Sequence, residues 1–157
     1  MRTNLDQLAA QRAQKIVEVV GARCRDERQV KADEVDGLVT KALGILQENG
    51  VYAAFLFLLA RSGGPQNRPE DLLGNEQRVA CQIVSELLQS LRDPGVDGLG
   101  LQLSDPPLTW NTVNSRKPAI LEHVAARVCG DLAPLLLVKG LFEQTLIYTR
   151  YGAKARA

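Results

Sequence analysis

Residues 51–60 read Val51-Tyr-Ala-Ala-Phe-Leu-Phe-Leu-Leu-Ala60 and contain no charged side chain. A helix without a polar face is stable only where neighbouring elements cover it. The preceding pair, Asn49-Gly50, tolerates the left-handed backbone at which helices end. We therefore expect residues 51–60 to form a helix at the centre of the core, separated from an earlier helix at Gly50.

Working outward from this segment, apolar residues recur at steps of three and four along most of the chain, which is the spacing of amphipathic helices. Runs of alternating β-branched residues between turns, which would predict strands, do not occur. The sequence thus predicts an all-α fold, a compact bundle of five to six helices in a single domain over residues 1–157. The predicted helices cover about residues 4–24, 33–49, 51–60, 70–92, 118–130 and 131–152.

Three non-helical segments complete this prediction. Residues 62–69 are rich in glycine and proline and predict a loop. A longer loop is expected over about residues 93–116, which include Trp110, and loops of this length often carry function. Trp110 could anchor the loop on the bundle or offer a stacking surface to a partner. A basic C-terminal tail is expected from about residue 152.

The overall charge excludes a strongly basic nucleic-acid-binding protein, because the 157 residues carry a formal net charge of only +1. The charge is unevenly distributed, since an acidic middle lies between two basic ends. Such an arrangement could bind a polyanion, pair with other copies of the chain, or pair within the fold, and pairing within the fold is the simplest interpretation. Arg12 lies near the apolar stripe of its predicted helix, so we expect its guanidinium to bind either a carboxylate or a partner at the helix edge, and a structural ion pair is the simpler interpretation.

The three cysteines are far apart and form no CxxC pair, which favours free thiols in a reducing compartment over disulfides or a zinc site. The first ten residues lack the apolar run of a signal peptide. The most apolar stretches are shorter than the roughly 20 residues that span a bilayer. We expect a cytoplasmic protein that has no membrane association.

Catalytic motifs are absent from the sequence. His123 is the only histidine, and there is neither a serine nucleophile elbow nor a glycine-rich phosphate loop. An enzyme that used Cys129 or His123 remains an alternative with little support. We expect no catalytic residue, no metal and no cofactor.

Two segments resemble the small helical subunit of type III-B (Cmr) CRISPR RNA-guided effector complexes. The first is Val35–Arg61, in which Lys41, Asn49, Gly50 and Phe57 match a lysine-bearing helix, an Asn-Gly corner and a buried helix rich in alanine and phenylalanine. The second is Leu141–Tyr151, in which Tyr148, Arg150 and Tyr151 match an aromatic, basic, aromatic pattern. Gln11-Arg12-Ala13 in a long first helix is also similar.

The resemblance implies a non-catalytic structural subunit in antiviral defence. Such subunits stack along the backbone subunits of the effector, beside the guide RNA and target RNA, and can stack on one another. Their contacts with RNA would be electrostatic and independent of sequence. The candidate phosphate-binding residues lie at predicted helix edges or ends near the matched motifs, and they are Lys15, Lys41, Arg61, Arg150 and Lys154.

An alternative from another class remains open. A helical adaptor or regulatory domain could bind only protein, through Trp110 and the 93–116 loop, with no nucleic-acid role. In that case the five basic residues would be ordinary solvated surface.

Overall fold

The computed structural model describes residues 4–21, 30–62, 74–91 and 116–156. Within these ranges the chain forms six α-helices and one short π-helix, and it contains no strand. The all-α prediction is confirmed for this part of the chain. Trp110 and the predicted 93–116 loop, apart from Arg116, lie outside the described residues. None of the described helices is long and apolar enough to cross a membrane.

Helix α1 (Leu5–Gly21) begins where the sequence predicts it, because Asn4 caps it. The Oδ1 atom of Asn4 accepts hydrogen bonds from the backbone N–H groups of Asp6, at 3.0 Å, and Gln7, at 3.4 Å. These amides have no partner within the first turn, so a side-chain acceptor stabilises the helix start. The predicted continuation beyond Gly21 lies outside the described residues.

Helices α2 (Ala32–Asn49) and α3 (Val51–Arg61) meet at Gly50, as predicted. Gly50 has a φ of 95° and a ψ of −177°, a combination that essentially only glycine adopts. Its N–H donates to the carbonyl of Leu46 at 3.0 Å, and its own carbonyl accepts from the N–H of Ala54 at 3.2 Å. One residue therefore ends α2 and begins α3.

Helix α4 (Asn75–Ser90) begins later than the predicted Glu70. Gly74 has extended backbone, and its N–H donates to the Oε1 atom of Gln77 at 2.9 Å, so Gly74 is the N-cap. The prediction of one continuous helix from Glu70 was wrong at Gly74, because the backbone of Gly74 is extended. Leu72 and Leu73, which the prediction included in this helix, lie outside the described residues.

The single helix predicted over residues 118–130 consists of two parts, α6 (Lys117–His123) and the π-helix η3 (Val124–Val128). The N–H of Cys129 donates to the carbonyl of Val124 at 2.9 Å, which is the wider spacing of a π-helix. A Cβ atom on Gly130 would lie 2.5 Å from the carbonyl oxygen of Ala126. Glycine is therefore required where the chain leaves η3.

Helix α7 (Leu132–Ala155) extends further than expected, so the basic tail predicted from about residue 152 is helical through Ala155. Gly152, interpreted from the sequence as a helix end, lies inside the helix. A Cβ atom at Gly152 would be 3.4 Å from the Cγ2 atom of Val17 in α1. The glycine therefore allows close packing between two helices instead of ending one.

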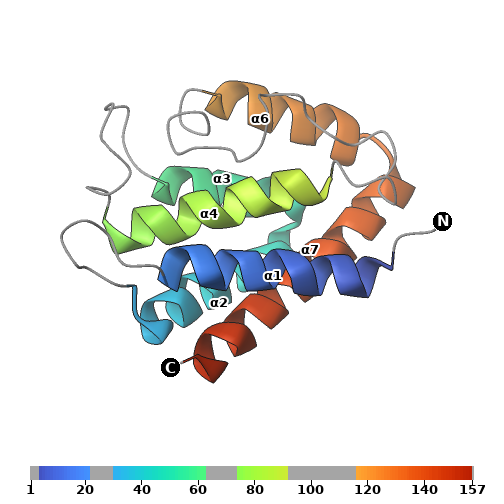
Figure 1. The fold of residues 1–157 in the computed structure, drawn as a ribbon. Coiled ribbons are helices and arrows are strands. Elements are labelled where there is room, and N and C mark those ends of the chain that lie inside the picture. The colour runs from blue at the N-terminus through green and yellow to red at the C-terminus, as the bar shows by residue number, and fades with distance from the viewer. Residues whose placement is uncertain (1–3, 22–29, 63–73, 92–115, 157) are drawn as a thin grey trace.

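The described helices pack around α7 and α4. Helix α7 crosses α1 and α2 diagonally and packs mainly against these two helices (Figure 1). Helix α4 packs against α1 and α3, and α3 also packs against α2. Helix α6 lies over α3 on the far side of the bundle from the C-terminal end of α7 (Figure 1).

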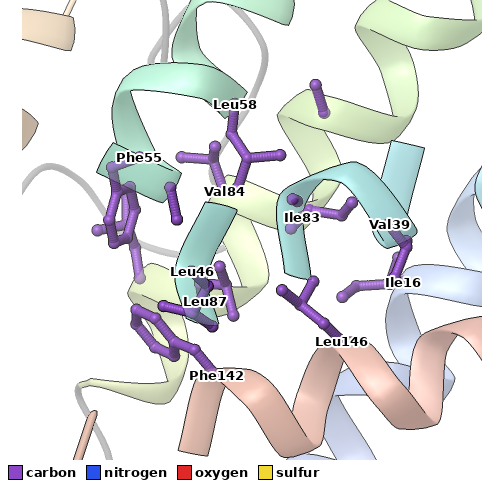
Figure 2. Packing of buried hydrophobic residues seen from close by; sticks show 14 of the residues in the cluster. Ile16, Val39, Leu46, Phe55, Leu58, Ile83, Val84, Leu87, Phe142 and Leu146 are labelled. Atoms are coloured by element: carbon purple, nitrogen blue, oxygen red, sulfur yellow. The ribbon is translucent and has the colours of Figure 1, made fainter. Parts of the chain in front are cut away.

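The hydrophobic core is formed mainly by α1, α2, α3, α4 and α7, part of which Figure 2 shows, and Ile120 of α6 with Val124 and Val128 of η3 completes it. Its centre contains an edge-to-face pair, Phe55 of α3 and Phe142 of α7, whose ring centroids are 5.7 Å apart. Both rings are fully buried. Buried aliphatic residues from α1, α2, α3, α4 and α7 fill the rest of this part of the core, and those labelled in Figure 2 are Ile16, Val39, Leu46, Leu58, Ile83, Val84, Leu87 and Leu146.

Helix α3 is only partly covered, which corrects the expectation that it is enclosed on all sides. Phe55 and Leu58 are buried, but Tyr52 is 39% exposed and Leu56 is 43% exposed. These two residues lie four positions apart and therefore share one face of the helix. One side of this apolar helix therefore packs into the core, and the other side exposes apolar side chains to solvent.

Candidate nucleic-acid interface

Lys15, Lys41 and Lys154 have exposed side chains on α1, α2 and α7, respectively. None of the three forms an ion pair with another described residue. Their ammonium groups are therefore accessible to phosphate. The three lysines come from three different helices, of which α7 packs against both α1 and α2.

Arg61, the last residue of α3, is already engaged with its neighbours. Its Nη1 atom is 2.8 Å from the Oε1 atom of Glu76, which lies in the first turn of α4. The guanidinium also lies over the ring of Phe57, at 5.1 Å from the ring centroid. Both partners of the ion pair are exposed, so solvent weakens the attraction, but Glu76 still offsets the charge that a phosphate would meet.

Arg150 connects α7 to α2. Its Nε atom donates to the Oδ1 atom of Asp36 at 2.6 Å. The two terminal guanidinium nitrogens form no hydrogen bond with a described residue. Arg150 therefore has a structural role through Nε, while the N–H groups of its two terminal nitrogens can donate to an anion.

Tyr148 makes a comparable contact on the other side of α7. Its hydroxyl donates to the Oδ1 atom of Asp6 in α1. This hydrogen bond raises the pKa of Tyr148, because loss of the proton would place a phenolate beside a carboxylate. The contact fastens α7 to α1, as Arg150 fastens it to α2.

Tyr151 lies between these two contacts and is 61% exposed. Along a helix, Tyr148 and Arg150 point in nearly opposite directions, with Tyr151 between them. Lys154 follows Tyr151 by three residues and therefore shares its face. Among the five basic candidates, only Arg150 and Lys154 lie one turn apart on the same helix. The exposed ring of Tyr151 lies between them in the sequence of α7.

The expected carboxylate partner of Arg12 is Glu86 of α4. The Nη1 atom of Arg12 donates to the Oε2 atom of Glu86 at 2.9 Å, and the amide of Gln82 donates to Oε1 at 3.1 Å. Burial raises the pKa of Glu86, and Arg12 opposes part of that rise. A raised carboxyl pKa can mark a catalytic acid, but here the carboxylate links α1 to α4.

The two residues considered for catalysis lie on either side of the π-helix η3. Burial raises the pKa of the Cys129 thiol, whereas an activated cysteine nucleophile has a lowered one. His123 ends α6, next to the π-helix. Among the residues that the structure describes, no group of three or more His, Cys, Asp or Glu side chains could hold a metal ion.

Exposed leucines at the start of α7 were not anticipated. Leu132 is 69% exposed, Leu136 is 58% exposed and Leu137 is 37% exposed. Apolar spacing alone could not reveal this, because this part of α7 is apolar around much of its circumference.

Comparisons with known proteins add no relative. No family model matches the chain, and no curated protein matches its sequence. The functional argument therefore depends on the residues themselves and on the geometry described above.

Proposed function

We propose that the protein is a non-catalytic structural small subunit of a type III-B RNA-guided effector complex, acting in antiviral defence in the cytoplasm. In this function it stacks along the backbone subunits, beside the guide RNA and target RNA. It contacts RNA phosphates through basic side chains without reading the sequence. The chemistry of target cleavage belongs to other subunits.

The observation that carries the proposal is the exposure of three lysines on three helices of an all-α bundle. Lys15, Lys41 and Lys154 form no close ion pair with a described residue, although Lys15 lies near enough to Glu86 to interact with its charge. Exposed cations on the surface of a helical bundle suit electrostatic contacts with a polyanion. The similarity of Val35–Arg61 and Leu141–Tyr151 to the Cmr small subunit is consistent with this interpretation.

Charge reversal of the lysines tests the proposal. We expect Lys15→Glu, Lys41→Glu and Lys154→Glu together to weaken binding of a labelled single-stranded RNA by about 100-fold. Loss of three phosphate contacts should also reduce the slope of log affinity against log salt by about 2. Fluorescence anisotropy over a salt series measures both quantities, and circular dichroism checks that the fold is unchanged.

A matched control variant distinguishes the loss of specific phosphate contacts from the effect of a change in net charge. Lys31→Glu, Arg116→Glu and Arg127→Glu make the same change in net charge at other exposed positions. This control variant should retain most of the wild-type affinity. Equal losses in the two triple variants, or no loss in either, would contradict the proposed contacts.

A second candidate function is a helical adaptor that binds only protein. The exposed leucines favour it, because apolar side chains exposed together on one helix segment are typical of protein interaction surfaces. For an adaptor, Leu132→Glu with Leu136→Glu should abolish the partner complex, and the triple lysine variant should leave it intact. Affinity purification with each variant distinguishes the two functions, since an effector subunit co-purifies with guide RNA and backbone subunits.

A further inference from the structure

Tyr151 is more exposed than Tyr52, the other exposed aromatic residue among those that the structure describes. It is 61% exposed near the end of α7, whereas Phe55 and Phe142 are fully buried. Tyr148, one turn earlier, uses its hydroxyl to fasten α7 to α1, but the hydroxyl of Tyr151 has no hydrogen-bond partner among the described residues. The ring is therefore available to a ligand.

The helix that carries Tyr151 is held firmly on both sides. The hydrogen bond from Tyr148 to Asp6 secures it to α1, and the ion pair of Arg150 with Asp36 secures it to α2. The backbone at Tyr151 is consequently fixed relative to the bundle. A ring presented from a fixed backbone loses less conformational freedom on binding than one on a mobile segment.

Cations flank this ring. Lys154 lies three residues further along and is exposed, and Arg150 offers two terminal nitrogens beyond the one that Asp36 uses. Asp6 and Asp36 are the carboxylates that contact this end of α7, and each already accepts a hydrogen bond. The negative charges of Asp6 and Asp36 together offset those of Arg150 and Lys154, and the exposed Arg156 at the C-terminal end of α7 adds a further positive charge.

We propose that Tyr151, Arg150 and Lys154 form a nucleotide-binding subsite for single-stranded RNA, in which a base stacks on the ring of Tyr151 and the adjoining phosphate contacts the two cations. Side chains three or four residues apart on a helix have Cβ atoms about 5–6 Å apart, which suits a base and its neighbouring phosphate. Every base has a π-face, so this stacking requires no particular sequence. The subsite depends on the proposed function and assigns it a specific location.

The test compares two ligands of equal charge. One is an oligouridylate roughly 12 nucleotides long, and the other is an abasic ribose-phosphate oligomer of the same length. We expect the wild-type protein to bind the oligouridylate more tightly. Tyr151→Ala should weaken oligouridylate binding by about tenfold and leave abasic-oligomer binding unchanged, because only the stacking contact is lost.

Two further variants control this experiment. Tyr151→Phe retains the ring and should bind oligouridylate like the wild-type protein. Tyr52→Ala removes another exposed aromatic ring, from α3, and should leave the affinity for both oligomers unchanged.

Each outcome has a distinct meaning. If Tyr151→Ala binds both oligomers as the wild-type protein does, the subsite is wrong while the proposed function stands. The same conclusion follows if Tyr151→Ala lowers binding of both oligomers and the thermal midpoint together, because the residue is then structural. If the wild-type protein binds neither oligomer, both the proposed function and the subsite are overturned.

Discussion

Phe142→Ala is expected to lower the free energy of unfolding by about 3–5 kcal/mol, because it empties a fully buried aromatic site. The ring of Phe142 packs edge to face on Phe55, and Leu46 of α2 and Leu87 of α4 lie beside it (Figure 2). The total stability of a domain is about 5–15 kcal/mol, so this single substitution removes a large part of it. Urea unfolding followed by circular dichroism measures the change.

Phe57→Ala is the matched control, since it removes the same ring from a half-buried position on α3. Its cost should be about 1 kcal/mol, which includes the loss of the contact with Arg61. Similar losses for the two variants would show that Phe142 is not at the centre of the core.

The ion pair between Arg12 and Glu86 gives the second large expected effect, and the effect is asymmetric. The side chain of Glu86 is 3% exposed and that of Arg12 is 27% exposed. Removing Arg12 leaves a carboxylate buried without its charged partner, whereas removing Glu86 leaves a guanidinium that can turn toward solvent. We expect Arg12→Met to cost about 2–4 kcal/mol and Glu86→Leu to cost less.

The double variant, Arg12→Met with Glu86→Leu, tests this interpretation. It should be more stable than Arg12→Met alone, because no buried charge remains. A double variant whose loss equals the sum of the two single losses would show that the pair is not coupled. Urea unfolding of the wild-type protein, the two single variants and the double variant gives the coupling free energy between the two residues.

The pH dependence of Arg12→Met has a defined sign. Burial raises the pKa of Glu86 above its ordinary value of 4.5, and Arg12 opposes this rise. Without Arg12 the pKa of Glu86 rises further, so the folded state retains a proton that the unfolded state releases above about pH 4.5. The variant should therefore lose stability as the pH rises from 4.5 toward neutrality, more steeply than the wild-type protein.

The sequence predicted most of the helices because their ends have local causes. Asn4 caps α1, and Gly50 adopts a backbone conformation that separates α2 from α3. Glycine also caused errors, because its role depends on its surroundings. Gly74 begins a helix, whereas Gly152 lies inside one and allows close contact with Val17.

The candidate interface was less predictable than the fold. The ion pair of Arg150 with Asp36 joins residues that are 114 positions apart, so local patterning could not indicate it. The same holds for the exposure of Tyr151 and Leu136, which depends on which sides of α7 are covered by α1 and α2. The sequence favoured a structural ion pair for Arg12, but it could not identify Glu86, which lies 74 positions away.

The packing of α7 across both α1 and α2 affects how the protein is made in the cell. A ribosome synthesises α1 first among the described helices and α7 last, so the apolar stripe of α1 stays partly uncovered until nearly the whole segment has emerged. Contacts between such distant parts of a chain form late and slow folding. The bundle can therefore be completed only after α7 has emerged from the ribosome. A fragment that lacks α7 exposes apolar surface and is prone to aggregate.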